Sequence, residues 1–382
     1  MKFTTTQENL SRGLATVGRA VASKSTLPVL SNVLMDATNG ALTLSATNLE
    51  IGIRTTVHNV RIDEPGQTTI PARLLTEFVN QLPAGSIDAV LTERTQSLNL
   101  RNGHHEANIK GMAADEFPTI AGPDQFTGWG IELQTELFQR MVGQTAFAAA
   151  TDESRPILTG VFLDLKLNHI ITMAAADGFR LAVTNAEYST GLDVTQSLVI
   201  PATSLAEAAR LATGDTVTMR VRSDGNQLLF DLGDTILVSQ LIEGRFPDYT
   251  QIVPKIHTTR VVMARAALTQ AVRTGLIFAK DAANILKLAI GDGQVTVSAE
   301  SSGRGDNESE LDAVVEGPGL EIALNARYLL DALTAAGTER VTLELMMPHN
   351  PGVIRGVGDD GYLSVLMPMM MVTRQRLRAV LH

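Results

Sequence analysis

One short segment occurs three times in this chain of 382 residues, with copies spaced about a third of the chain apart. The copies are IPARLLTEFVNQLPAG at 70–85, IPATSLAEAARLATG at 200–214 and LNARYLLDALTAAG at 324–337. The first two begin with a strand end and a Pro–Ala helix start, continue as an amphipathic helix, and reach a stop signal that contains Gly. A chain that repeats this pattern is expected to repeat the structure around it.

Other segments recur in the same order within each third. Each third opens with a short strand and an apolar pattern at helical spacing, as at Leu10, Leu14 and Val17. An alternating strand with a turn follows, and a Pro after an apolar residue closes the unit. The opening segments start at residues 2, 131 and 261, so successive starts lie 129 and 130 residues apart. This period is longer than the roughly 20–50 residues of a solenoid repeat and has the length of a whole domain.

The pattern predicts an α+β fold of three tandem, similar domains, residues 1–125, 126–256 and 257–382. Each domain is predicted to carry two helices on antiparallel sheet, because the order strand–helix–strands occurs twice in each unit. The boundaries fall in the loop-like stretches 121–130 and 254–260. Six helices are expected, near residues 7–21, 72–82, 136–149, 202–213, 265–280 and 326–336.

The net charge of the chain and the charge of its predicted helices have opposite signs. A net charge of −10 argues against nucleic acid as a partner, because phosphate binding needs basic surface. The six predicted helices, however, hold nine Arg or Lys and five Asp or Glu, so they carry +4 and the remainder carries −14. Chance scatter would also give these counts. Alternatively, the helices share one surface that faces a polyanion while the acidic strands face outward.

The chain contains no cysteine, which excludes disulfides, thiolate metal sites and a cysteine nucleophile. Its N-terminus has no apolar run of signal length, and no stretch approaches 18 apolar residues. These features predict a cytoplasmic protein that does not associate with a membrane.

Nine short segments together carry a resemblance to a known family. They are TLPVLSNVL (26–34), LSATNLEIG (44–52), IPARLLTEFVNQLP (70–83), DEFP (115–118), SRPILTGV (154–161), ADGFRLAV (176–183), EGRFPDY (243–249), LNARYLLDAL (324–333) and MPM (367–369). In order, spacing and threefold placement they resemble the bacterial sliding clamp, the beta subunit of the replicative DNA polymerase holoenzyme. The resemblance covers essentially the whole chain.

The resemblance implies a DNA clamp fold in which two chains join head to tail as a homodimer and close into a ring around double-stranded DNA. Helices would line the hole, and strands would form the outer sheet. The ring would be a processivity factor that tethers the replicative DNA polymerase and other clamp-binding-motif proteins, without chemistry of its own. A separate clamp loader ATPase is implied, because the chain lacks a Gly-rich phosphate loop ending in Lys-Ser or Lys-Thr.

Interchangeable phosphate contacts would position the duplex without reading its bases, and would let the ring slide. Lys24 precedes the TLPVL segment, where the family has a basic DNA-contacting residue. Arg155 lies in a loop that resembles a DNA-contacting loop, although Pro156 and Ile157 replace the aromatic residues usual there. The candidate DNA contacts are Lys24, Arg73, Arg140, Arg155 and Arg210.

The resemblance also implies a hydrophobic cleft between the second and third domains, which receives a short linear peptide of each partner. Side chains of Met, Leu, Val and Pro suit apolar anchors, and flexible Met adapts to different partners. Core packing is the alternative for Leu181 and Val365. Position by position, the cleft residues would be Leu158, Ala176, Gly178, Phe179, Arg180, Leu181, Pro247, Ile252, Asn325, Tyr328, Val365, Leu366, Met367, Pro368 and Met369.

Several positions depart from the family pattern. Phe179 stands where His is common, Gln251 where a cation is frequent, and Met370–Met371 replace the usual Arg–Leu ending. The chain then continues as VTRQRLRAVLH (372–382), a basic tail that could be a short helix, a disordered end or a lid near the cleft. Ile277 and Phe278 are candidate dimer-interface residues, with core burial as the alternative.

Two other functions stay open from the sequence. One is a specialised duplicate clamp with an altered cleft, suggested by the changed C-terminus. The other is a hydrolase using His104 or His105, although neighbouring strand residues point to opposite faces and make a poor shared metal site. GVGDDG at 356–361 matches a dinucleotide motif, but it precedes a strand-like segment, so a hairpin turn and no cofactor are expected.

Overall fold

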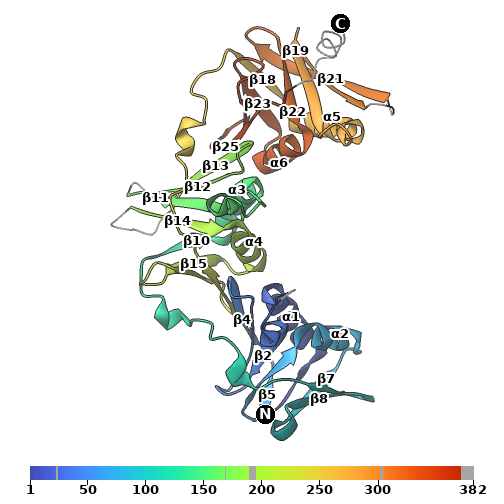
Figure 1. The fold of residues 1–382 in the computed structure, drawn as a ribbon, viewed down its shortest axis with the longest axis vertical. Helices are drawn as coiled ribbons and strands as arrows, with labels where there is room; N and C mark the ends of the chain where they lie inside the picture. Colours follow the sequence, from blue (N-terminus) through green and yellow to red (C-terminus); the bar gives the residue numbers. More distant parts are fainter. Residues whose placement is uncertain (23–24, 168, 189–194, 302, 304, 371–382) are drawn as a thin grey trace. The chain divides into compact units, whose positions relative to one another are not determined.

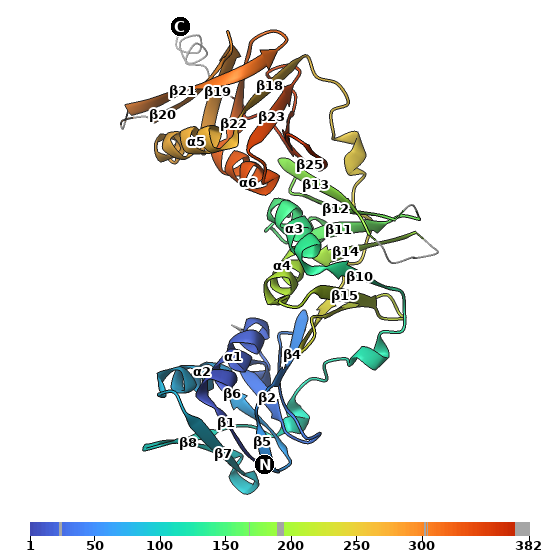
Figure 2. The ribbon, with the colours of Figure 1, turned by 180° about the vertical axis from the view of Figure 1, so that it is seen from behind.

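The structure is a computed structural model that describes residues 1–22, 25–167, 169–188, 195–301, 303 and 305–370 (Figures 1 and 2). Two compact units account for it. The first consists of Met1–Gln139 with Thr203–Ile242, and the second of Arg140–Ala202 with Glu243–His382. The basic tail predicted at 372–382 lies outside the described residues.

The described residues contain six α-helices, and each starts within one residue of its predicted position. They are α1 (Gln7–Val17), α2 (Ala72–Gln81), α3 (Thr135–Thr145), α4 (Ala202–Leu211), α5 (Arg265–Ala279) and α6 (Ala326–Ala336). The predicted ends of the first and third helices were wrong by about one turn. There the chain tightens into 3₁₀ turns, at Gly18–Ala20 and Ala146–Ala148, because 3₁₀ bonds satisfy the last helical carbonyls.

The third copy of the repeated segment shows how its sequence sets the limits of a helix. The Oδ1 atom of Asn325 accepts hydrogen bonds from the backbone N–H groups of Arg327 and Tyr328, at 2.9 and 3.4 Å, and so caps the start of α6. Gly337 ends the helix at φ 68°, a left-handed conformation that glycine adopts without steric cost.

The first unit contains two antiparallel sheets. The five-stranded sheet has the order β5 (Arg61–Glu64), β1 (Lys2–Thr6), β7 (Ser86–Thr92), β8 (Ser97–Asn102) and β9 (His105–Lys110). The eight-stranded sheet has the order β10 (Gly130–Gln134), β15 (Thr216–Val221), β16 (Gln227–Asp231), β17 (Thr235–Gln240), β4 (Ile51–Val57), β3 (Leu42–Thr47), β2 (Asn32–Asp36) and β6 (Gln67–Pro71). Helices α1 and α2 pack side by side in this unit (Figures 1 and 2).

The second unit contains one twelve-stranded sheet with α5 and α6 packed beside each other (Figures 1 and 2). Its order is β14 (Gln196–Pro201), β11 (Gly160–Leu165), β12 (Ile170–Ala176), β13 (Arg180–Glu187), β25 (Asp359–Leu366), β24 (Gly352–Gly356), β23 (Arg340–Leu345), β18 (Thr259–Ala264), β21 (Gly305–Glu316), β20 (Gln294–Ser301), β19 (Ile285–Gly291) and β22 (Leu320–Asn325). The pair β13–β25 aligns Leu181 with Val365, so residues far apart in sequence become direct neighbours.

Two further expectations concern local structure and membranes. The GVGDDG motif joins β24 to β25 as a hairpin, with Gly356 paired to Asp359, which confirms the predicted turn. Across the described ranges, none of the helices combines the length and hydropathy needed to cross a bilayer.

Candidate nucleic-acid and partner-binding surfaces

All six described helices share one feature: each buries an apolar face and exposes at least one arginine on the other. On α1, for example, Leu10 and Leu14 are buried while Arg12 is exposed. The exposed arginines are Arg12, Arg73, Arg140, Arg210, Arg273 and Arg327. Arg12 of α1 and Arg210 of α4 also line one recess of about 310 Å³ in the first unit. Each described helix therefore exposes positive charge, and a basic surface shared by the helices stays a prediction.

These arginines differ in their carboxylate partners. Arg73 pairs with Glu77 one turn along its helix at 2.8 Å, and this hydrogen bond raises the pKa of the guanidinium above its ordinary value. Arg12 pairs in the same way with Glu8, and Arg210 with Glu207. For Arg140 and Arg273, no carboxylate in the described ranges lies within ion-pair distance. Arg140 and Arg273 therefore expose a positive charge that no neighbouring carboxylate in the described ranges offsets.

Acidic side chains lie on the opposite side of the sheet from α5. Helix α5 packs on β20 and β21, and Asn307 of β21 faces it with a buried side-chain oxygen. Strand residues alternate between faces, so the neighbouring even-numbered positions point away from α5. The exposed carboxylates on that outer face are Asp306, Glu308, Glu310, Asp312 and Glu316. At β21, acidic side chains thus lie on the face away from α5, while the separation of charge across the whole chain stays a prediction.

Three of the predicted DNA contacts lie on described helices, one lies in a loop, and one is outside the described residues. Arg73, Arg140 and Arg210 are exposed on α2, α3 and α4. Lys24 lies outside the described residues. Arg155 precedes a 3₁₀ turn at Pro156–Thr159, and its Nη2 donates to the backbone carbonyl of Asp177 at 2.9 Å. It is therefore engaged with the segment predicted to bind partner peptides.

Most of the predicted peptide-binding residues lie around the start of β13 and the end of β25. The backbone N–H of Met367 donates to the carbonyl of Phe179 at 2.9 Å, and Arg180 lies opposite Leu366 in the strand pair. Five of the predicted residues are buried and belong to the core or floor, namely Leu158, Ala176, Leu181, Val365 and Leu366. Five are exposed, namely Gly178, Phe179, Pro247, Ile252 and Met367.

The floor under these residues is a continuous apolar cluster. Ala176, Leu181 and Val365 pack in it with residues that the sequence analysis did not select, such as Val183 and Val353. Tyr249 and Val253 pack against its edge. Pro247 lines a recess of about 480 Å³ with the stacked rings of Phe162 and Phe246, and Phe162 also packs against the cluster.

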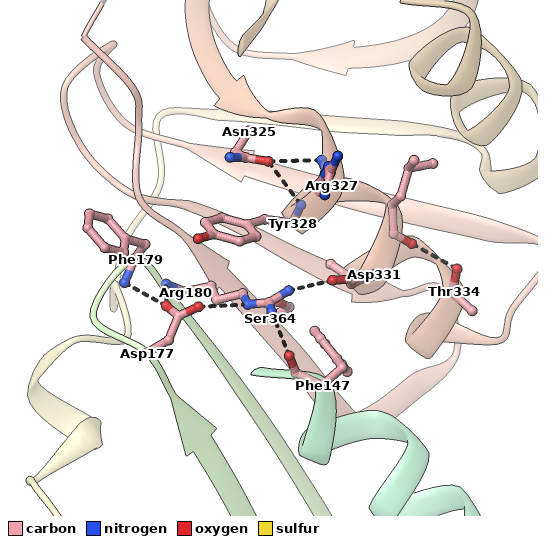
Figure 3. A network of polar contacts seen from close by, with 12 residues as sticks. Phe147, Asp177, Phe179, Arg180, Asn325, Arg327, Tyr328, Asp331, Thr334 and Ser364 are labelled. Carbon is pink, nitrogen blue, oxygen red and sulfur yellow. Dashed lines mark hydrogen bonds and ion pairs between the residues drawn. The ribbon is translucent and has the colours of Figure 1, made fainter. Parts of the chain in front are cut away.

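Arg180 is the most connected side chain at this surface (Figure 3). Its guanidinium contacts the Asp177 carboxylate at 3.0 Å, the Asp331 carboxylate at 2.5 Å and the carbonyl of Phe147 at 2.6 Å. It also stacks on the Tyr328 ring, 4.4 Å from the centroid. Only 11% of the Arg180 side chain is exposed. Burial raises the pKa of the Tyr328 phenol, so this ring stays neutral beside the arginine.

Arg180 was predicted from the sequence, but the groups that hold it were not. Asp177 carried a usable signal, because an Asp–Gly pair between two strands indicates a turn in which the carboxylate accepts backbone N–H groups. Asp331 and the carbonyl of Phe147 carried none, since both come from segments distant in sequence. Asn325 caps α6 through the same Oδ1 that would otherwise be free for a peptide.

The remaining candidates lie elsewhere in the two units. Ile277 on α5 is 61% exposed, whereas Phe278 is half-buried. His104 lies in the turn before β9 and His105 starts that strand, and both side chains are exposed. In the part of the chain that the structure describes, no group of three potential metal-ligating side chains occurs.

Comparisons with known proteins agree across the chain. Models of the N-terminal, central and C-terminal domains of the DNA polymerase III beta subunit match residues 1–121, 132–248 and 250–370. A beta sliding clamp from Staphylococcus aureus is 29% identical over 378 residues, which cover 97% of this chain and 99% of the relative. The DNA polymerase sliding clamp from Bacillus subtilis superposes with a TM-score of 0.91 at 26% identity, covering 97% of this chain and 99% of that one. The Pseudomonas aeruginosa beta subunit gives 0.89 at 28% identity, covering 97% of this chain and all of the other.

The repeated helix pairs, the sheets and these superpositions define the class: the chain has the fold of a DNA sliding clamp. The three consecutive domain matches then show that it belongs to the DNA polymerase III beta subunit family. The predictions of this family, of three tandem clamp domains and of a sliding-clamp function are confirmed. Closure of the ring stays a prediction.

Proposed function

We propose that two copies of this chain form a closed ring that slides on double-stranded DNA and holds a replicative polymerase there. The observation that carries the proposal is the exposed arginine on every described helix, with acidic residues on the outer face of the sheet. A surface of separate arginines binds phosphates at many equivalent positions, so the energy changes little as the duplex moves past. Arg73, Arg140 and Arg210 are the proposed contacts that the structure describes.

Two unpaired strand edges support ring closure. Strand β9 pairs only with β8 within the described sheets, and it forms the edge of the five-stranded sheet. In β21, residues 305–312 pair with β20 alone, because β18 takes only residues 313–316. Free edges tend to pair with another chain. We propose that β9 of one copy meets β21 of the other, with exposed Ile277 beside the junction, so that head-to-tail contacts close the ring.

The partners follow from the clamp role. We propose that the polymerase and other clamp-binding-motif proteins insert a short apolar peptide beside Phe179, Tyr328 and Met367, over the buried floor of Leu181 and Val365. A separate ATPase would open the ring, and the chain itself would catalyse no reaction. Domain limits at 1–125, 126–256 and 257–382, and a place in the cytoplasm with the chromosome, complete the proposal.

Retention on DNA tests the proposal. The protein is loaded with its loader onto nicked circular duplex, the salt concentration is raised, and half of the sample is then linearised. A topological link predicts that the protein survives salt on the circle and leaves the linear molecule through its ends. Equal loss from circular and linear DNA would show ordinary electrostatic binding and would contradict the ring.

A further inference from the structure

The residues 177–180, here called the Phe179 turn, connect β12 to β13. The Asp177 carboxylate accepts the backbone N–H groups of Phe179 and Arg180 at 2.8 and 3.0 Å. Gly178 has φ 93°, a conformation that disfavours any residue with a Cβ atom. The turn therefore presents Phe179 at its tip, with 55% of the side chain exposed.

Two arginines from different segments hold this turn. Arg180 pairs with the Asp177 carboxylate at 3.0 Å from the β13 side. Arg155 donates to the Asp177 carbonyl at 2.9 Å, and a Cβ atom placed on Gly178 would lie 3.0 Å from the Arg155 Nη1. The second guanidinium thus lies against the face that glycine leaves open. A backbone bond from Leu158 N–H to the Arg155 carbonyl, at 3.0 Å, fixes the base of Arg155 itself.

Displacing the turn would change the peptide-binding surface directly. The Phe179 carbonyl accepts the backbone N–H of Met367 at 2.9 Å, so the turn also fixes where the chain leaves β25. Phe179 and Met367 are both exposed and apolar, so they are accessible to a peptide above the buried floor.

We propose that Arg155 is a positioning residue of the partner-peptide surface rather than a DNA contact. Arg155 holds the Phe179 turn through the Asp177 carbonyl, and Gly178 supplies the positive φ of the turn while leaving room for the Arg155 guanidinium. The inference rests on the proposed function, because it reassigns to the peptide surface a residue that the sequence resemblance assigned to DNA.

The test separates the two roles with matched variants of the full chain. Arg155→Ala removes the donor, Arg155→Lys keeps the charge without the planar fork, and Arg140→Ala removes an exposed helix arginine as the control. Each protein is measured in three ways: hydrogen exchange of the segment 177–181, affinity for a short linear duplex at low salt, and peptide binding. The peptide probe is the tightest wild-type binder among short fluorescein-labelled peptides tiled along the replicative polymerase of the same genome.

Arg155→Ala is expected to speed exchange in the turn and to weaken peptide binding about tenfold, the effect of removing one hydrogen bond from a charged donor. Its affinity for the short duplex should match wild type, and Arg155→Lys should recover part of the peptide affinity. Arg140→Ala should show the reverse pattern, with weaker duplex binding and unchanged peptide binding.

Unchanged exchange in Arg155→Ala, or faster exchange with unchanged peptide affinity, would overturn the inference. Weaker binding to the short duplex with normal peptide binding would restore Arg155 as a DNA contact and would also overturn it. Failure of every tiled peptide to bind the wild-type protein would instead contradict the proposed partner-binding function, and the exchange result would still decide whether Arg155 holds the turn.

Discussion

Arg180 links three segments of the second unit, and its ion pair with Asp177 is largely removed from water. The Arg180 and Asp177 side chains are 11% and 13% exposed. Removing one partner of such a pair leaves the other charge without compensation, which costs more than the pair itself contributes. Arg180 is therefore one of the side chains that hold the proposed peptide-binding surface in place.

We predict that Arg180→Ala lowers the free energy of unfolding by about 3 kcal/mol. The value is at the low end for a buried pair, because Asp331 is 45% exposed and water can replace its contact. Urea unfolding followed by circular dichroism measures the change. Arg327→Ala, on an exposed arginine, is the control and should stay within about 0.5 kcal/mol of wild type; equal effects of the two variants would contradict the account.

The four tyrosines predict a loss of stability in alkali. Burial is the largest cause raising the pKa of Tyr188, Tyr249, Tyr328 and Tyr362 above 10, most strongly for Tyr362. A raised pKa in the folded state stabilises the protein fully below about pH 10, the unfolded value, and this stabilisation disappears as the pH rises through the folded value. The unfolding free energy should therefore fall above about pH 10.

Tyr362→Phe isolates the largest contribution. Its hydroxyl donates to the Ala332 carbonyl at 3.2 Å, so the variant should lose about 1 kcal/mol near neutral pH. Above about pH 10 the variant should lose less stability than wild type, because it has no phenol to ionise on unfolding. Urea unfolding at several alkaline pH values gives the slope of unfolding free energy against pH for each protein. Equal slopes for Tyr362→Phe and wild type would refute this explanation.

At the residue level, the sequence identified important side chains more accurately than it predicted their roles. The ADGFR segment identified Phe179 and Arg180 because the family pattern includes them. The role of Arg155 was not predictable, because its partner is a backbone carbonyl 22 residues away, and carbonyls carry no sequence signal.

On the scale of elements, two helix glycines have opposite surroundings. A Cβ atom on Gly275 of α5 would lie 2.7 Å from the Cδ2 of Leu286, which is fully buried in β19. A Cβ atom on Gly143 of α3 would meet nothing within 4 Å. Gly275 therefore permits close packing of helix on sheet, whereas Gly143 has no packing role in the described structure.

Alanine substitution should separate these two glycines. Gly143→Ala is expected to raise the free energy of unfolding by about 0.4–1 kcal/mol, because alanine restricts the unfolded chain and favours the helix. Gly275→Ala is expected to lower it by about 1–3 kcal/mol through overpacking, despite the same gain in helix propensity. Thermal unfolding of both variants measures these changes in stability. A stabilising Gly275→Ala would show that α5 can move away from β19.

The pairing of the helix arginines predicts unequal effects on DNA binding. Arg140→Gln should weaken binding to a short duplex at low salt more than Arg73→Gln, because Glu77 already shares the Arg73 charge. Glu77→Gln should strengthen binding slightly by freeing Arg73. Removing one phosphate-binding arginine should reduce the slope of log affinity against log salt by about 0.9. Equal effects of the two arginine variants would mean that their carboxylate partners do not matter.

Helix starts were predictable because the repeated segments carry local start signals, as Asn325 does for α6. The ends of α1 and α3 were not, because the final turn of a helix changes to 3₁₀ geometry without a strong sequence signal.

For the whole molecule, the internal repeat is sufficient to predict the number of domains. It does not predict the strand pairs that join distant segments, such as β4 with β17 or β13 with β25. Those pairs depend on long-range register, which periodicity within one strand does not specify. The same limit applies to the pairing of one copy with another.

Closure of the ring by β9 and β21 can be tested directly with introduced cysteines, because the chain contains none of its own. One cysteine replaces Ala107 in β9 and another replaces Ser309 in β21, and the protein is loaded onto nicked circular duplex before a bis-maleimide links the two strands across copies. The account predicts a covalently closed dimer that stays on the circle in denaturing detergent and is released when the circle is cut. Release from the intact circle in detergent, or the absence of a cross-linked dimer, would contradict a ring closed by β9 and β21.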